Sequence, residues 1–458
     1  MVKSTASNGE SRATPRASLA ALGAKLCALD LFAPIRTLVR VPQKTVKHTP
    51  TDKLYDCFIG ILAGAAGVAD IERVLRADPA LQAAFGRTTC AEQSTLQDTL
   101  DACTAETVTQ MEAAMDQLFR EYSRACQHDF TQAYLLVDAD LTGNPCGPKA
   151  ACATKGYFAG QRNRRGRQVG RVLAADYHEI VVDQLFPGTT QLTGALVPLI
   201  EASETTLQLT PARRKRTLVR VDGGGGSVEA VNELLSRDYL VLCKDYSAQR
   251  AAKLAQSVRQ GYPDPKEPGR EVGWVEEPAT AYVRPVRRLA VRYQKANGQQ
   301  GVEVLITNAP LPEVFRRLGT PASDEPAAEL IALAHFYDQR GGACETSFRD
   351  DKQGLGLTKR NKKRFCAQQM LVQLGALAHN VLIWAKGWLV PAAPRLAKYG
   401  VQRLVRDVMG ILGRVELDGD GRVQRIVLTE ASPLARQVVA AFQQLGASVG
   451  IAVILGRT

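Results

Sequence analysis

The sequence predicts an α/β fold whose central sheet begins with three strands in succession and continues with alternating strands and helices. A doubly wound sheet would alternate from its first strand, so this order favours an RNase H-like core. The strands are expected at residues 133–137, 169–175, 179–186, 217–221 and 239–243, and the helices at 192–202 and 227–235. A β-rich insertion is expected to interrupt this core, and a helical domain to precede it.

Composition supports a soluble globular chain with an anionic partner. Apolar residues make up 45% and charged residues 23%, and 58 Lys and Arg against 46 Asp and Glu leave a net charge of +12. Such an excess favours nucleic acid, although a basic surface kept for solubility is the alternative. The longest nearly apolar run, residues 58–69, is shorter than the ~18–20 residues that span a bilayer. No signal peptide or membrane partner is expected, and the protein is expected in the cytoplasm.

The N-terminal part divides into two regions. Residues 1–50 are rich in Ser, Thr, Ala and basic residues with scattered prolines, which predicts a flexible basic arm with one short helix near 19–32. Residues 51–130 have apolar residues at helical spacing, and Ser94 precedes a short polar helix. This helical domain is a candidate DNA reader, and simple core packing explains the same pattern equally well.

The rest of the chain divides into four regions. Residues 131–250 form the first part of the core, and 251–325 form the β-rich insertion, with a turn at Asn297-Gly298. Residues 326–390 return to the core with long helices. Residues 391–458 contain a hairpin centred on residues 418–421 and a closing amphipathic helix.

Two aspartates end strands that are neighbours in an RNase H-like sheet. Asp140 follows the first strand and Asp222 follows the fourth, so both are expected at one edge of the sheet. Magnesium favours carboxylate oxygens, and a pair of metal ions stabilises the attacking and leaving oxygens of a phosphoryl displacement. Asp138 lies on the same strand face and is the alternate first ligand. Any single aspartate here is alternatively a turn or cap residue.

A third carboxylate, Glu345, is expected on a helix after the insertion. At ~100° per residue, Lys352 falls about 20° to one side of Glu345 and Arg349 about 40° to the other. This helix face presents a carboxylate between two cations, an arrangement that suits a metal beside a phosphate. Ordinary ion pairing on a solvated helix is the alternative.

These residues resemble a known signature. Tyr337-x2-Arg340 followed by Glu345-x6-Lys352 resembles the Y-R-E-K signature of bacterial insertion-sequence DDE transposases, the cut-and-paste branch. Asp140-Leu141-Thr142 resembles that family's first aspartate motif, and Val221-Asp222-Gly223 resembles its second. The resemblance covers roughly residues 50–440. Four residues separate Arg340 from Glu345 where the family usually has three, and a turn or helix bulge at Gly341-Gly342 would absorb the extra one.

The resemblance implies a DNA transposase that cleaves transposon ends and transfers the strands into target DNA. Asp140, Asp222 and Glu345 would bind two Mg²⁺ (or Mn²⁺) ions, and Tyr337, Arg340 and Lys352 would hold phosphates. The partner would be double-stranded DNA, both terminal inverted repeats and target. A homodimer in a synaptic complex is implied, with the C-terminal region contributing to it, on the bacterial nucleoid. The alternatives are an RNase H-like nuclease without strand transfer and a non-catalytic DNA-binding protein derived from a transposase.

Three basic runs flank the proposed acids. Residues 141–171 contain seven basic residues and no acidic one, with Tyr157 and Phe158 between them. We expect this strip to bind DNA, together with the runs at 213–216 and 359–364, whereas one basic run alone is usually a solvated face. The DNA-binding candidates of the first strip are Arg162, Arg164, Arg165 and Arg167, and Arg349 is a further candidate.

Two other features have open interpretations. The Gly223–Gly226 run follows a strand and precedes a helix, but no Gly-Lys-Ser/Thr follows it, so close approach to DNA is favoured over a nucleotide loop. The insertion carries Arg284, Arg287, Arg288 and Arg292, and Trp274 lies at the start of its strand-patterned part. Trp274 either stacks on an unpaired base near the cut or anchors the small core of the insertion.

Overall fold

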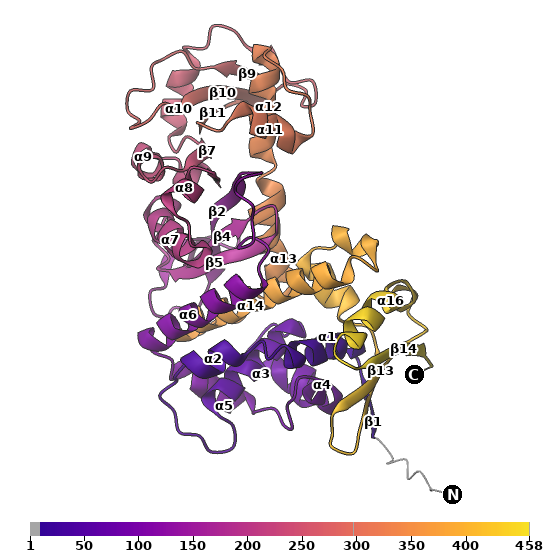
Figure 1. Cartoon of the computed structure of the whole chain (residues 1–458). Helices are drawn as coiled ribbons and strands as arrows, with labels where there is room; N and C mark the ends of the chain where they lie inside the picture. Colours follow the sequence, from indigo (N-terminus) through magenta and orange to yellow (C-terminus); the bar gives the residue numbers. More distant parts are fainter. Residues whose placement is uncertain (1–9, 296, 458) are drawn as a thin grey trace, which may run out of the picture. The chain divides into compact units, whose positions relative to one another are not determined.

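The computed structural model describes residues 10–295 and 297–457. The chain forms two compact units (Figure 1). The first comprises Met1–Ser123, Asn144–Arg167 and Ser347–Thr458. The second comprises Arg124–Gly143 and Gln168–Thr346. Two strands and one helical segment therefore pass from one unit to the other.

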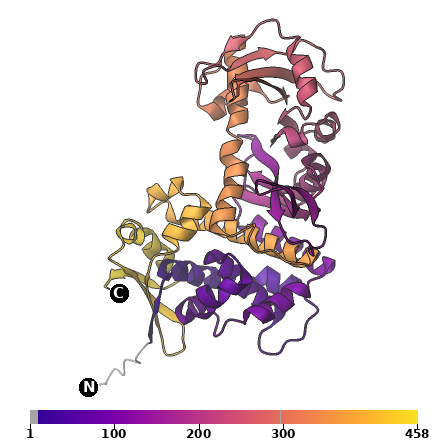
Figure 2. The ribbon, with the colours of Figure 1, turned by 180° about the vertical axis from the view of Figure 1, so that it is seen from behind.

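Helices form most of the first unit. Its long central helix α14 (Phe365–Leu389) is buried along most of its length and packs against α3, α5 and α6 (Figure 2). Apolar residues on every side of α14 explain this burial, because such a helix is stable only when it is surrounded. The N-terminal helices are α1 (Ala17–Ala28), α2 (Ala33–Leu38), α3 (Pro50–Leu62), α4 (Pro79–Ala84), α5 (Gln93–Asp101) and α6 (Ala105–Tyr122). The predicted polar helix is α5, and its Leu96 and Leu100 are buried.

The structure differs from the flexible arm expected over residues 1–50. Residues 1–9 lie outside the described residues, but from Ser11 onward the chain is part of the folded unit. Helix α1 is buried along most of its length, and β1 (Ser11–Thr14) pairs with a C-terminal strand. The Ala- and Leu-rich composition of α1 allows close packing. The basic residues and prolines around this helix led to the prediction that the region is flexible.

The C-terminal region forms a small sheet in the order β1-β12-β13-β14. The predicted hairpin is β12 (Gly413–Leu417) and β13 (Val423–Thr429), and the closing helix is α16 (Pro433–Ala447). Strand β14 (Ala452–Gly456) adds parallel to β13 and was not predicted. The first and last described segments of the chain therefore meet in one sheet.

The main sheet has the predicted order of elements except for strand β3, which was not predicted and precedes the second predicted strand. Its strands run β3-β4-β2-β6-β7-β11-β10-β9-β8, and β5 also pairs with β4. Strands β2, β6 and β7 are mutually parallel, whereas β4 and β5 are antiparallel. The strands are β2 (Leu135–Pro145), β3 (Thr154–Phe158), β4 (Gln161–Ala174), β5 (Glu179–Phe186), β6 (Thr217–Val221) and β7 (Leu240–Lys244).

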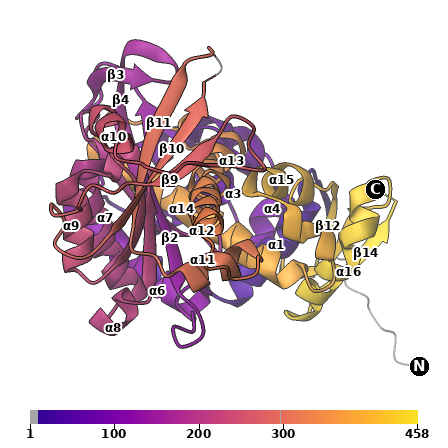
Figure 3. The same cartoon turned by 90° about the horizontal axis from the view of Figure 1, so that it is seen from above.

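Helices cover both faces of the part of this sheet in the second unit. Helices α7 (Leu192–Leu207) and α9 (Val228–Ser236) lie on one face, and α12 (Pro326–Asp338) lies on the other (Figure 3). The short α8 (Pro211–Arg214) precedes β6. Each parallel strand is almost wholly buried, as a sheet covered on both faces requires.

The insertion extends the same sheet. Strand β11 (Gln300–Thr307) pairs antiparallel with β7, and β10 (Arg287–Gln294), β9 (Glu271–Trp274) and β8 (Tyr262–Pro263) follow outward. Helix α10 (Ala248–Ala255) packs Leu254 against Val304, and α11 (Leu311–Leu318) contacts α12. Among the described residues, no helix is both long and apolar enough to span a bilayer.

Candidate active site

Strand pairing brings the two aspartates together. In the parallel pair β2 and β6, Asp138 lies opposite Arg220 and Ala139 lies opposite Val221. Asp140 and Asp222 are the next residues on each strand, so the register places them side by side where β6 ends. Apolar residues before each aspartate bury the strands and thereby fix this register.

Asp140 is held in a poorly solvated position. Its side chain is 13% exposed, and its carboxylate accepts a hydrogen bond of 2.8 Å from the Leu141 amide. Burial and the negative charge of Asp222 raise the pKa of Asp140 to about 6. Two carboxylates held together in this way call for a cation between or beside them.

Asp222 also has a local structural role. Its carboxylate accepts a 2.8 Å hydrogen bond from the Gly224 amide and caps a short turn at Gly223–Gly225. A Cβ at Gly226 would overlap the Lys244 carbonyl oxygen, so this glycine allows close backbone packing. The next helix, α9, is already capped by the hydroxyl of Ser227. Local packing therefore explains the tight turn.

Glu345 is the last residue of a π-helical turn, Gly341–Glu345, which follows α12 and precedes α13 (Thr346–Gly354). This turn contains the extra residue between Arg340 and Glu345 as a bulge, as the glycine pair predicts. The Thr346 hydroxyl donates a hydrogen bond of 3.0 Å to the Gly341 carbonyl and closes the turn. Glu345 itself is 55% exposed.

Arg340 links the two sides of the candidate site. Its guanidinium lies 3.3 Å from Asp140 and 2.7 Å from Glu345, and the side chain is buried. Burial alone would lower the pKa of Arg340, but the charge of Asp140 and its neighbours raises it above its ordinary value. The guanidinium thus acts as the counter-ion of both carboxylates. Arg340 also contacts the ring of Tyr337, whose pKa is raised well above its usual range mainly by burial.

Asp138, the alternate first ligand, is bound elsewhere. Its carboxylate forms a two-pronged ion pair with Arg220, at 2.8 and 3.0 Å, and is fully buried. Arg220 also donates to the Phe336 carbonyl of α12. The sequence interpretation missed Arg220, although its position opposite Asp138 on the neighbouring strand is the signal that identifies it. Arg220 thereby links Asp138 to α12, whereas Asp140 lies just beyond the last pair of β2 with β6.

The donor set fits a divalent cation in chemical type. Asp140, Asp222 and Glu345 offer only oxygen ligands, as Mg²⁺ and Mn²⁺ prefer, and Asp140 is near enough to both others for their charges to raise its pKa. Within residues 10–295 and 297–457, no three His, Cys, Asp or Glu side chains are arranged as a ready metal site. Arg340 instead contacts two of the three carboxylates.

The predicted phosphate contacts beyond Glu345 lie on α13. Arg349 is exposed and Lys352 is half-buried, and both belong to the first unit. Their proposed role at the site stays a prediction. The structure does describe the local helix that carries them, which begins directly after the π turn.

The arginines of the first basic strip differ in exposure. Arg162 and Arg164 are exposed, and Arg165 is half-buried with a hydrogen bond to the Ala153 carbonyl. Arg167 is completely buried and donates to the carbonyls of Ala151, Lys362 and Lys363. The prediction that Arg167 belongs to the DNA-binding strip is therefore wrong, because its guanidinium is buried and donates to three carbonyls inside the protein.

The run at 213–216 is also largely engaged within the fold. Arg213 and Arg216 lie over the rings of Phe130 and Tyr134, and Arg214 pairs with Glu204. Lys215 is exposed. This run therefore offers DNA less charge than its sequence indicates.

The insertion arginines have acidic, carbonyl or aromatic partners. Arg284 pairs with Asp238, Arg292 pairs with Glu271 at 2.6 Å, and Arg288 donates to the Glu277 carbonyl. Arg287 lies 5.1 Å from the centre of the Trp274 ring, and Trp274 is half-buried. These contacts favour the structural interpretation of Trp274.

Two cavities flank the π turn. They measure about 610 and 700 Å³, and Gln339 and Gly342 line both. A Cβ at Gly342 would meet no other atom within 4 Å. Ala343 and Cys344 of the turn are nevertheless buried, and Arg340, which pairs with Glu345, also reaches Asp140 of the sheet.

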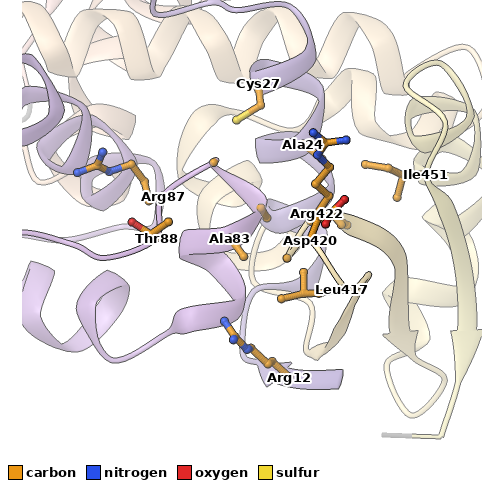
Figure 4. Close-up of a pocket in the computed structure, with 14 residues that line it drawn as sticks. Arg12, Ala24, Cys27, Ala83, Arg87, Thr88, Leu417, Asp420, Arg422 and Ile451 are labelled. Atoms are coloured by element: carbon orange, nitrogen blue, oxygen red, sulfur yellow. The ribbon is translucent and has the colours of Figure 1, made fainter. Parts of the chain in front are cut away.

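A separate cavity of about 610 Å³ lies in the first unit (Figure 4). Side chains from α1, from the segment after α4 and from the β12–β13 hairpin line it, among them Cys27, Arg87 and Arg422. Arg87 is already neutralised by Asp52 and Asp56, at 2.9 and 2.8 Å. The cavity shares no residue with the carboxylate site.

Comparison with known proteins gives limited information. No family model matches the chain, and no curated protein matches it. Among solved structures, the cryo-EM structure of a piggyBac transposase synaptic complex with hairpin DNA covers 84% of this chain and 79% of that chain. The identity is 12% and the TM-score is 0.47. At this level of similarity, function has to be inferred from the side chains themselves.

Proposed function

We propose that the chain is a DDE-type DNA transposase that cleaves transposon ends and joins them to target DNA. The observation that carries this proposal is the placement of Asp140 and Asp222 side by side where the pairing of the parallel strands β2 and β6 ends, with Arg340 joining Asp140 to Glu345. The finer assignment, to the bacterial insertion-sequence branch with the Y-R-E-K signature, is supported by the spacing of Tyr337, Arg340, Glu345 and Lys352.

The strand order supports an RNase H-like core. In chain order the first five core strands are β2, β4, β5, β6 and β7, and they lie as β5-β4-β2-β6-β7. The first strand is thus central, and the fourth and fifth add parallel to it. This order places the two aspartate-bearing strands beside each other, which a catalytic pair requires.

Each carboxylate has a separate part in the proposed mechanism. Asp140 and Asp222 are fixed by rigid strands and would hold the ions, and Glu345 would complete the oxygen ligands from the π turn. When bound, the two Mg²⁺ ions supply charge stabilisation to the attacking and leaving oxygens. Arg340 and Tyr337 would orient a DNA phosphate beside them, since a guanidinium donates two parallel hydrogen bonds to a phosphate.

The test is metal-dependent cleavage of DNA that carries the terminal sequences of the encoding element. Asp140→Asn, Asp222→Asn and Glu345→Gln should each abolish cleavage while DNA binding persists. Asp338→Asn is the matched control, because Asp338 is an exposed carboxylate of α12 that pairs with Arg270. Undiminished cleavage by Glu345→Gln, or equal loss in the control, would contradict the assignment.

The same reaction separates the alternatives. A transposase joins the cleaved ends to a second DNA molecule, whereas a nuclease releases them unjoined, and a derived DNA-binding protein does neither. If a homodimer holds two transposon ends together, one complex should contain both DNA molecules. The C-terminal region would contribute to the interface between the two subunits. An enzyme of this kind would be found with the bacterial nucleoid.

A further inference from the structure

Two basic segments that are far apart in the sequence are joined in the first unit. They are the outer part of the β3–β4 hairpin, residues 155–164, and the segment 359–364 that precedes α14. Buried Arg167 connects them: its guanidinium donates to the Ala151 carbonyl at 2.7 Å and to the carbonyls of Lys362 and Lys363 at 3.1 and 2.8 Å. The Ala151 amide also donates to the Lys363 carbonyl.

The hairpin is a two-stranded ribbon that ends in a tight turn. Ala159 and Gly160 both have positive φ, as the tight hairpin turn requires. Phe158 lies over Gly156 and Gly166, where a Cβ at either position would collide with its ring. Tyr157 points away from this packing and is 71% exposed. This large aromatic side chain, exposed beside the tight turn, is available for contact with another molecule.

Both segments direct cations outward. Lys155, Arg162 and Arg164 are exposed on the ribbon, and none of them pairs with an acidic residue among those the structure describes. In the other segment Lys359 and Lys363 are exposed, whereas Arg360 is buried and Lys362 donates to Gln97. The ribbon and the segment therefore present unneutralised charge, in contrast to the ion-paired arginines of the insertion.

We propose that these segments form one binding surface for duplex DNA. The major groove of B-form DNA admits a two-stranded ribbon, so the hairpin would enter the groove with Tyr157 at the bases. Lys359 and Lys363 would contact the phosphates beside it, and Arg167 would hold the two segments in register. The deep, narrow major groove of duplex RNA would exclude the ribbon. The choice of DNA rests on the proposed function, but binding needs neither metal nor the carboxylates.

The first test is binding of a mixed-sequence 30-base-pair DNA duplex to the full chain, followed by fluorescence anisotropy in EDTA at several salt concentrations. Arg162→Gln with Arg164→Gln should reduce the salt slope by about 2, at ~0.9 per lost phosphate contact. Lys359→Gln with Lys363→Gln should do the same. The matched control, Arg284→Gln with Arg292→Gln, removes the same charge from ion-paired positions and should leave the slope unchanged.

The outcomes separate this proposal from the catalytic one. The proposed surface would be refuted by an unchanged salt slope in either basic variant or by an equal loss in the control. Equally tight binding of duplex RNA would also refute it. A protein that binds in this way but cleaves nothing would leave the surface intact and refute only the catalytic proposal. Tyr157→Ser should weaken binding without lowering the melting temperature, because the side chain is exposed.

The second test concerns the joining of the two segments. Arg167→Met retains every exposed cation, so two independent strips would bind DNA as before. One joined surface predicts a loss of about tenfold or more in affinity, because the unheld segments must be ordered on binding. Affinity is measured well below the variant's melting temperature, on material whose circular dichroism matches the wild type. Unchanged affinity would overturn the joining role of Arg167.

Discussion

Within the paired part of strands β2 and β6, and just beyond it, two carboxylates of β2 are held in opposite ways. Asp138 is fully buried and is neutralised by Arg220 from the next strand. Asp140, two residues later on the same face, lies beside Asp222, and its ion pair with Arg340 is longer, at 3.3 Å. Asp138 has an arginine of its own, whereas Asp140 shares Arg340 with Glu345.

This contrast shows how one sequence motif yields one structural and one candidate functional group. A buried carboxylate with two good hydrogen bonds to an arginine is satisfied, and it fixes the strands to α12. A carboxylate beside another carboxylate is destabilising unless a cation joins it. The position of Asp140 therefore has the electrostatic properties that a cation site needs, because the charge of Asp222 adds to burial in disfavouring its charged form.

The largest expected effect is loss of stability in Asp138→Asn. The substitution leaves the Arg220 guanidinium buried without its counter-charge, so unfolding free energy should fall by about 3–5 kcal/mol. Urea denaturation measures it. Asp338→Asn removes one partner of an exposed ion pair and should cost less than about 1 kcal/mol. Equal effects of the two substitutions would show that the buried Asp138–Arg220 pair contributes no more to stability than an exposed ion pair.

The next effect is a gain of stability in metal-free Asp140→Asn that depends on pH. Because the pKa of Asp140 is raised from 3.8 to about 6 in the folded state, the wild type loses stability as the pH rises through this interval. At ~1.4 kcal/mol per pKa unit, the variant should be more stable at pH 8 by up to about 3 kcal/mol. The gain should vanish near pH 4. A variant that is less stable than the wild type at pH 8 would contradict the account.

Much of this arrangement was predictable from the sequence. Apolar runs ending in Asp140 and Asp222 indicated neighbouring strands, and Gly341-Gly342 indicated where the helix accommodates an extra residue. These signals are local, and the strand order then follows from the succession of elements. The π turn at Gly341–Glu345 has the expected place in the chain.

The partners of charged side chains were not predictable in the same way. Arg162 and Arg167 are equivalent in the sequence, yet one is exposed and the other is bound to three carbonyls. The insertion looks equally basic, but Arg284 and Arg292 have acidic partners. Whether a charge is available depends on long-range packing, which neither composition nor periodicity contains.

The smallest expected effect concerns Trp274. Its contact with Arg287 and its half-buried position predict a structural role, so Trp274→Ala should lower unfolding free energy by about 1–2 kcal/mol. Reaction on uncut and pre-cut ends should slow equally or not at all. Normal stability with slower processing of uncut ends alone would instead show that Trp274 contacts DNA near the cut.

The most direct test of the central claim is calorimetric titration of the full-length protein with Mn²⁺ in the absence of DNA. The account predicts binding by the wild type and by Asp338→Asn, and loss of binding in Asp140→Asn, Asp222→Asn and Glu345→Gln. This result would show that the three carboxylates act as one cation site. Binding by all three variants at wild-type affinity would contradict it.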